Sequence, residues 1–348
     1  MKPESSPISL DEPVLEAVGL TKHFRVTNSI VPGRKTRYLH AVDDVSLTLR
    51  AGRVTALVGE SGSGKSTVAR LLARLYLPTA GSILFRGQNV TNERRRGSRL
   101  RYRAQVQMIF QDPFSSLNPV KRIDHHLARP LRIHHIVRRR LVGQKIAELL
   151  TTVGLIPPDE YAHVFPHQLS GGQRQRVAIA RALAVEPIAL LADEPISMLD
   201  VSIRIGIMNL MLSLKEERRL ALLYITHDIA SARYVADELV VMYAGQVVEH
   251  GMTEDVLQAP LHPYTKLLLS AVPNPEAGLQ TRRVEARGEV PSIIDPMPGC
   301  RFAPRCPFVM DDCRSITPEL GKEGTKQWVR CHLYPARAQA SSNLISAS

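Results

Sequence analysis

"VTALVGESGSGKSTVARLL", residues 54–72, decides the fold of this chain. The apolar run VTALV (54–58) is typical of a short buried strand, and the apolar periodicity from Ser66 onward is typical of a helix. Between them, GESGSGKST (59–67) matches the phosphate-loop pattern G-x-x-x-x-G-K-[ST] in full. Because the motif has the strand–loop–helix context that it requires, the stretch predicts a nucleotide-binding site.

Each part of this loop has an expected role. Glycines let backbone N–H groups turn toward phosphates, and the following helix adds the positive end of its dipole. Lys65 would reach the β- and γ-phosphates, and the Ser66 hydroxyl would contact Mg²⁺. The candidate nucleotide ligands are Gly59, Glu60, Ser61, Gly62, Ser63, Gly64, Lys65, Ser66 and Thr67.

Further apolar runs, IALLADEP (188–195) and ALLYITHD (221–228), read as central strands separated by helices, which predicts an α/β fold with a mainly parallel sheet. Phosphoryl transfer needs Mg²⁺ and a positioned water. At the end of the first run, Asp193 would help to hold Mg²⁺ and Glu194 would act as the general base.

Composition narrows the class of protein. The 348 residues contain 45 Lys and Arg against 33 Asp and Glu, and the net charge of +12 favours anionic partners. The densest basic runs, 94–103 and 137–140, are interpreted first as solvated faces. No apolar run approaches the roughly 18 residues of a membrane span, and the start of the chain has no apolar secretory region. We expect a cytosolic chain with reduced thiols.

The stretch LSGGQRQRVAIARAL (169–183) contains a second potential anion site, because Ser170 and the glycines open a helix. The first loop already binds the phosphates of the nucleotide in its own chain. A second anion site is therefore expected to contact a nucleotide that is bound to another subunit. With these residues the chain resembles the ATP-binding cassette (ABC) family over about residues 14–270. In that family two cassettes pair head to tail, which implies that Ser170, Gly171, Gly172 and Gln173 cap the ATP of a partner.

The resemblance implies a P-loop NTPase cassette, with a RecA-like core, an antiparallel β subdomain and a helical subdomain at about 112–172. Gln111 matches the residue that contacts Mg²⁺ and signals to membrane subunits, so Ser66, Gln111 and Asp193 are the expected Mg²⁺ ligands. His227 matches the switch histidine at the γ-phosphate, which makes Glu194 and His227 the expected catalytic pair. Asp200 matches a dimer-interface residue. Phe24 matches the aromatic that stacks on adenine, with Tyr38 as its competitor.

Three stretches indicate the branch: FQDPFSSLNP (110–119), HPYTKLLLSAVP (262–273) and the cysteine-rich tail. Together they resemble cassettes of bacterial oligopeptide/dipeptide importers. That resemblance implies an ATPase at the cytoplasmic face of the cell membrane, paired with a second ATPase subunit, identical or not. Two permease subunits and an extracytoplasmic solute-binding protein complete the expected assembly. Relatives with the same tail move peptides, nickel or oligosaccharides, so the solute stays open.

Two other functions agree less well with the sequence. A soluble cassette ATPase acting on nucleic acid or ribosomes would suit the net charge, but such proteins commonly carry two cassettes or a long coiled-coil insertion. This chain has one phosphate loop and neither insertion nor heptads, so no nucleic-acid partner is expected. A regulator that does not hydrolyse ATP is disfavoured by the presence of Glu194.

All four cysteines, Cys300, Cys306, Cys313 and Cys331, lie in the last 49 residues. The C-x2–4-C knuckle of structural zinc sites is absent, and four cysteinates suit a [4Fe–4S] cluster. Some peptide-importer ATPases that resemble this chain carry such a cluster, whereas zinc and unmetallated thiols remain alternatives. The expected division is a cassette at 1–271, a cysteine-rich domain at 272–335 and a disordered tail at 336–348.

Overall fold

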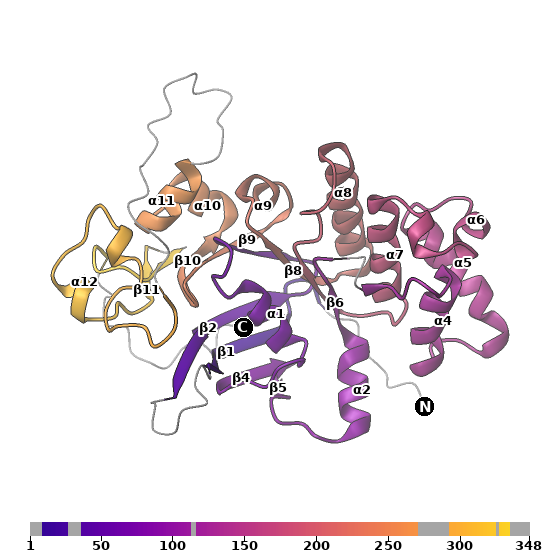
Figure 1. The fold of residues 1–348 in the computed structure, drawn as a ribbon, viewed down its shortest axis with the longest axis horizontal. Helices are drawn as coiled ribbons and strands as arrows, with labels where there is room; N and C mark the ends of the chain where they lie inside the picture. Colours follow the sequence, from indigo (N-terminus) through magenta and orange to yellow (C-terminus); the bar gives the residue numbers. More distant parts are fainter. Residues whose placement is uncertain (1–8, 27–35, 113–115, 271–291, 325–326, 335–348) are drawn as a thin grey trace.

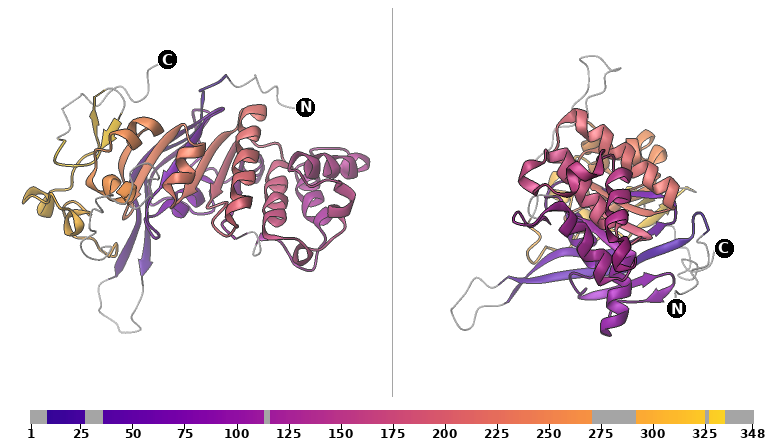
Figure 2. Two further views of the ribbon diagram at one scale, coloured as in Figure 1. Left: turned by 90° about the horizontal axis from the view of Figure 1, so that it is seen from above. Right: turned by 90° about the vertical axis from the view of Figure 1, so that its right-hand side faces the viewer.

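The computed structural model describes residues 9–26, 36–112, 116–270, 292–324 and 327–334. Two sheets form the centre of the molecule, with a helical part at one end and the cysteine-rich segment at the other (Figures 1 and 2). The predicted tail at 336–348 and the predicted boundary near residue 272 lie outside the described residues.

The larger sheet contains the predicted parallel strands in the order β11-β12-β10-β9-β3-β8-β7-β6. Strands β9, β3, β8, β7 and β6 are parallel to one another, whereas β10, β12 and β11 continue the sheet in antiparallel fashion. Their bounds are β3 Val54–Val58, β6 Val106–Ile109, β7 Ala189–Asp193, β8 Ala221–Thr226, β9 Glu238–Tyr243, β10 Gln246–Met252, β11 Gly321–Glu323 and β12 Gln327–Val329.

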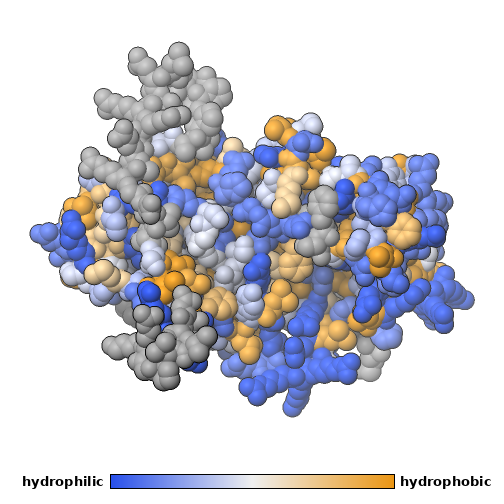
Figure 3. Space-filling view, in the orientation of Figure 1, coloured by the Kyte–Doolittle hydropathy of each residue, from blue (hydrophilic) through white to orange (hydrophobic). Residues whose placement is uncertain are grey.

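The smaller sheet is the expected antiparallel β subdomain. Its order is β2-β1-β4-β5, with bounds β1 Pro13–Val26, β2 Arg37–Arg50, β4 Ala80–Phe85 and β5 Gln88–Asn89. Helix α1, Lys65–Leu72, packs between the two sheets and buries Val68, Leu71 and Leu72. Helix α2, Arg96–Gln105, carries the basic run, and the hydrophilic projection in the lower part of Figure 3 is this helix.

The described residues of the helical subdomain expected at about 112–172 contain α4, α5 and α6, and α7, α8 and α9 follow along the larger sheet (Figure 1). The bounds are α4 Ile123–Ile133, α5 Val142–Thr152, α6 Pro158–Ala162, α7 Gly171–Leu183, α8 Val201–Arg218 and α9 Ile229–Val235. Short 3-10 turns occur at Arg139–Leu141, Pro166–Gln168 and Ala303–Arg305.

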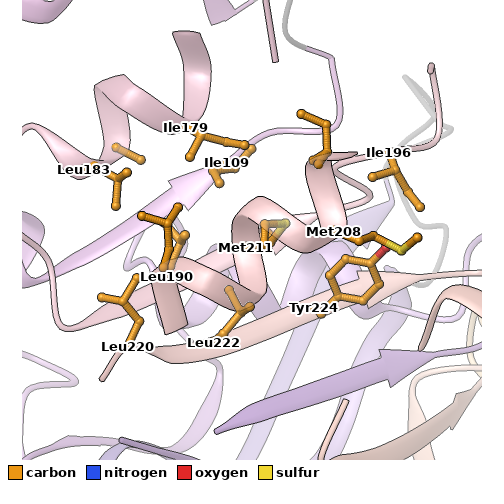
Figure 4. Packing of buried hydrophobic residues seen from close by; sticks show 14 of the residues in the cluster. Ile109, Ile179, Leu183, Leu190, Ile196, Met208, Met211, Leu220, Leu222 and Tyr224 are labelled. Atoms are coloured by element: carbon orange, nitrogen blue, oxygen red, sulfur yellow. The ribbon is translucent and has the colours of Figure 1, made fainter. Parts of the chain in front are cut away.

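Alternation along the central strands divides the core into two layers. Leu57 packs with α1, whereas its neighbours Ala56 and Val58 pack in the cluster on the other side. In that cluster, side chains of α7 and α8, such as Leu183 and Met211, meet Leu190 and Leu222 from β7 and β8 (Figure 4). Because both faces are covered, the strands read as continuous apolar runs.

The cysteine-rich segment is joined to the cassette rather than set apart from it. After α10 (Thr253–Gln258) and α11 (Pro263–Ser270), the described chain resumes at residue 292 and includes α12 (Asp312–Ser315). Strand β12 pairs with β10, and the buried Phe302 belongs to the main core cluster. Its status as a domain of its own therefore stays a prediction. In the described ranges no helix is both long and apolar enough to span a bilayer.

Candidate nucleotide site

The candidate residues lie where neighbouring parallel strands end. The phosphate loop follows β3, Glu194 follows β7, His227 follows β8 and Gln111 lies just after β6. In the sheet β3, β8, β7 and β6 are adjacent, so their carboxyl ends form one edge. Ligands of open α/β sheets bind outside this edge.

Two glycines give the phosphate loop its path. Gly59 has φ 151° and Gly64 has φ 102°, both outside the range that other residues adopt readily. A Cβ atom on Gly59 would lie 2.2 Å from the Met242 carbonyl oxygen, and one on Gly64 would lie 2.2 Å from that of Ala41. The loop therefore packs directly on the backbone of β9 and β2.

Lys65 is curled into this loop. Its Nζ donates to the carbonyl oxygens of Gly59 at 2.7 Å and Glu60 at 2.8 Å, and it lies 3.3 Å from Ser63 Oγ. Burial lowers the pKa of Lys65, whereas Glu194, Asp193 and Glu60 raise it in opposition. A cation held inside a glycine-rich loop is a suitable partner for phosphate oxygens.

Ser66 and Asp193 meet across the sheet edge. Ser66 Oγ donates to Asp193 Oδ1 at 2.8 Å. Burial raises the pKa of Asp193, and the Ser66 hydrogen bond lowers it in opposition. A hydroxyl beside a carboxylate is a donor set that Mg²⁺ accepts, so these two residues fit the expected ion.

Two candidate side chains, those of Gln111 and His227, converge on Glu194. Gln111 Nε2 donates to Glu194 Oε2 at 3.0 Å, and His227 Nδ1 lies 3.4 Å from the same oxygen. The backbone of Glu194 has φ 46°, a left-handed conformation that costs energy in a residue other than glycine. Its N–H donates to the Ile225 carbonyl at 3.0 Å, which fixes this conformation against β8.

The residues predicted to cap the ATP of a partner lie at the start of α7. Ser170 caps α7: its Oγ accepts from Gln173 N at 3.3 Å, and its N–H donates to Gln173 Oε1 at 2.8 Å. Gly171 and Gly172 begin the helix. Side chains of α7 and of α1 pack in different core clusters, so the helices that follow these two loops lie on opposite faces of the larger sheet.

The aromatic candidates lie on adjacent strands. Phe24 is half-buried and contacts the edge of Tyr76, with ring centroids 5.4 Å apart. Tyr38 is 44% exposed, and its backbone N–H donates to Asp295 Oδ1 at 2.8 Å. Neither geometry selects one ring for adenine, so the assignment of Phe24 stays a prediction.

All four cysteines line one cavity of about 10 Å³ beside α11. Burial raises the pKa of the Cys300 thiol to about 11 and also raises that of Cys306 and Cys331. Among described residues, the one group of three or more ligand atoms that lie within 4.8 Å of one another is His23, His40 and Asp43. The four thiols thus line one cavity, but their sulfur atoms are not as close together as the ligands of a single metal ion.

Sequence reasoning missed two residues that reach the phosphate loop from the C-terminal part. Glu60 N donates to Tyr264 Oη at 2.8 Å, and Arg305 donates to both Glu60 carboxylate oxygens, at 2.8 and 3.1 Å. The separations are 204 and 245 positions, and no local pattern pairs residues at such a distance.

Two family models match the chain. "ABC transporter" matches residues 42–197, and "Oligopeptide/dipeptide transporter, C-terminal region" matches residues 248–313. The oligopeptide transport ATP-binding protein AppF of Bacillus subtilis is 42% identical over 93% of this chain and 98% of its own length. The dipeptide transport ATP-binding protein DppF of Escherichia coli is 39% identical over 93% of this chain and 95% of its own length.

A solved structure supports the same assignment of the fold. The dimeric post-hydrolysis state of the ATP-binding cassette MJ0796, bound to ADP and Pi, superposes with a TM-score of 0.60 at 28% identity. The match covers 69% of this chain and 98% of that one, so the fold is a P-loop ABC ATPase cassette. The chain belongs to the ATPase subunits of ABC transporters, in the branch that carries the oligopeptide/dipeptide transporter C-terminal region.

Proposed function

We propose that this protein is the ATP-hydrolysing subunit of an importer that takes up peptides through partner permeases. The observation that carries the proposal is the convergence of Gln111, Glu194 and His227 beside the Ser66–Asp193 pair. The similarity to AppF and DppF over nearly their whole lengths supports peptides as the solute.

In this mechanism the phosphate loop binds the ATP phosphates through its backbone N–H groups and Lys65. Glu194 accepts the proton of the attacking water, and His227, whose side chain is 59% exposed, turns toward the γ-phosphate. Gln111 holds Glu194 through its amide until nucleotide arrives. Mg²⁺ would supply neutralisation of the developing phosphate charge, and Ser66, Asp193 and Gln111 are the residues that would hold it.

A second ATPase subunit completes the site in this proposal. Ser170 and the N-terminus of α7 would cap the ATP of the partner, because α7 lies on the other face of the larger sheet from α1, the helix that follows the phosphate loop of the same chain. Three apolar side chains beside Asp200 are exposed: Met198 by 57%, Val201 by 73% and Ile205 by 51%. Such a strip is suited to burial against another chain.

The permeases would receive the signal through the segment after Gln111, part of which lies outside the described residues. The protein would act at the cytoplasmic face of the membrane, supplied with solute by an extracytoplasmic binding protein. Reconstitution of the complete transporter in liposomes tests the proposal. Radiolabelled dipeptide or oligopeptide should accumulate with ATP inside the compartment that the ATPase faces, and not with Glu194→Gln. Accumulation of oligosaccharide or nickel instead of peptide would contradict the proposed solute.

The four thiols would hold a [4Fe–4S] cluster that stabilises the C-terminal segment. A single zinc ion places sulfur ligands about 3.8 Å apart, and no three of these sulfurs approach within 4.8 Å of one another. All four thiols line the cavity that the cluster would occupy. Anaerobic purification with iron and sulfide analysis decides the matter. Iron-free protein, or zinc in place of iron, would contradict the cluster.

A further inference from the structure

The first turn of the phosphate loop is held by the cysteine-rich segment. Glu60 occupies the second position of GESGSGKST, and its carboxylate receives a two-pronged contact from the Arg305 guanidinium, at 2.8 and 3.1 Å. The side chain of Arg305 is only 7% exposed and that of Glu60 is 28% exposed. Paired hydrogen bonds of this kind fix orientation as well as distance.

Arg305 is itself held by an aromatic cluster. The Tyr243 and Phe302 rings lie 5.8 and 6.0 Å from its Cζ atom, and the Tyr243 and Tyr264 centroids are 4.5 Å apart. Tyr264 accepts the backbone N–H of Glu60. Both the side chain and the backbone of Glu60 are therefore fixed from the C-terminal part of the chain.

The turn that presents Arg305 runs between two cysteines. Ala303 N donates to the Cys300 carbonyl at 3.0 Å, Arg305 N donates to that of Phe302 at 2.9 Å, and Cys306 N donates to that of Ala303 at 3.3 Å. The positions of Cys300 and Cys306 thus set the position of the guanidinium. This turn is therefore a direct path along the chain from the cysteine-lined cavity to the guanidinium that contacts Glu60.

A second set of contacts also runs from the cysteine-rich segment toward the phosphate loop. Arg301 donates to the Ala244 carbonyl oxygen and to the Asp43 carboxylate. The next residue, Gly245, donates its N–H to the Ser63 carbonyl at 3.0 Å. The segment therefore supports the phosphate loop at two places.

We propose that Arg305 is a positioning residue that couples the cysteine-lined cavity to the phosphate loop, so that the state of the thiols sets the affinity for ATP. The inference rests on the proposed nucleotide site. It predicts that Arg305 changes nucleotide binding and leaves the chemical step, performed at Glu194, unaltered.

The test uses the full-length chain and a fluorescent ATP analogue. Arg305→Met keeps the side-chain length and removes the charge. It should weaken binding on the order of tenfold and raise KM with kcat unchanged. Arg305→Lys, which keeps the charge without the paired contact, should recover part of the loss, and Glu60→Gln should weaken binding similarly. Arg314→Met, at an exposed position of the same segment, is the matched control and should bind like the unaltered chain.

The coupling is measured by a double-mutant cycle with Cys306→Ser. If the signal passes through Arg305, Cys306→Ser weakens binding in the unaltered chain and has little further effect with Arg305→Met. Additive losses, or unchanged affinity in both Arg305→Met and Glu60→Gln, would overturn the proposal. If the unaltered chain failed to bind the analogue, the nucleotide site itself would be refuted, and the inference with it.

Discussion

Gln111 Nε2 donates a hydrogen bond to Glu194 Oε2 over 3.0 Å, although the two residues are 83 positions apart. The contact joins the end of β6 to the end of β7. Gln111 also begins the segment that leads into the helical part of the molecule. Gln111 therefore holds the proposed general base, Glu194. Movement of the helical part would reach the site through Gln111.

Glu194→Gln should abolish ATP hydrolysis while ATP still binds. The amide keeps the shape of the side chain but cannot accept the proton of the attacking water, and general-base catalysis contributes roughly 10²–10⁴-fold. Phosphate release would be measured at saturating ATP, and gel filtration should show an ATP-bound dimer. Glu217→Gln, at an exposed position of α8, is the control. Hydrolysis at the normal rate by Glu194→Gln would disprove the assignment of the base.

Lys65→Ala should abolish nucleotide binding. The ammonium group is held at 2.7 Å from the Gly59 carbonyl oxygen and 2.8 Å from that of Glu60, inside the loop where phosphate oxygens would lie. Equilibrium titration with a fluorescent ATP analogue measures the loss, and Lys121→Ala, at an exposed position, serves as the control. Retained tight binding would place the phosphates elsewhere.

Local sequence patterns predicted the parts of the site that each strand brings to the sheet edge. The loop after Val58, the carboxylates after Ala192 and the histidine after Thr226 are all continuous with apolar runs. Contacts between remote segments could not be predicted in this way. The Glu60–Arg305 pair depends on the packing of the C-terminal segment against β9. No sequence pattern around either residue indicates that it contacts the other.

Cys306→Ser should lower the iron content of anaerobically purified protein and its melting temperature. The four thiols line one cavity, and a cluster that bridges them would hold a segment with little core of its own. Iron and acid-labile sulfide would be assayed together with thermal unfolding. Thr317→Ser, at an exposed position of the same segment, is the control. Equal iron content in Cys306→Ser and unaltered protein would remove this residue from the ligand set.

His262 introduces a pH dependence of folding. The residue is 1% exposed, and its Nδ1 accepts the N–H of Tyr264 at 3.0 Å. Burial lowers the pKa of His262 from 6.5 to about 3. In contrast, burial raises the pKa of its neighbour Glu249, whose carboxylate accepts the N–H groups of Leu261 and His262.

The pKa of His262 is 6.5 in the unfolded chain and about 3 in the folded chain. At pH values between the two, the unfolded chain binds a proton that the folded chain does not. The free energy of unfolding is therefore lost as pH falls from 6.5 toward 3, by up to about 1.4 kcal/mol per pH unit from this group. Glu249 has the opposite sign, because its raised pKa adds stability at low pH. His262→Asn keeps an acceptor for Tyr264 and removes the titration, so its stability should fall less between pH 7 and pH 5. Urea unfolding at both pH values measures the difference, which contains little of the Glu249 contribution because that group is common to both proteins. Equal losses in the two proteins would show that the pKa of His262 is the same in the folded and unfolded states, contrary to this prediction.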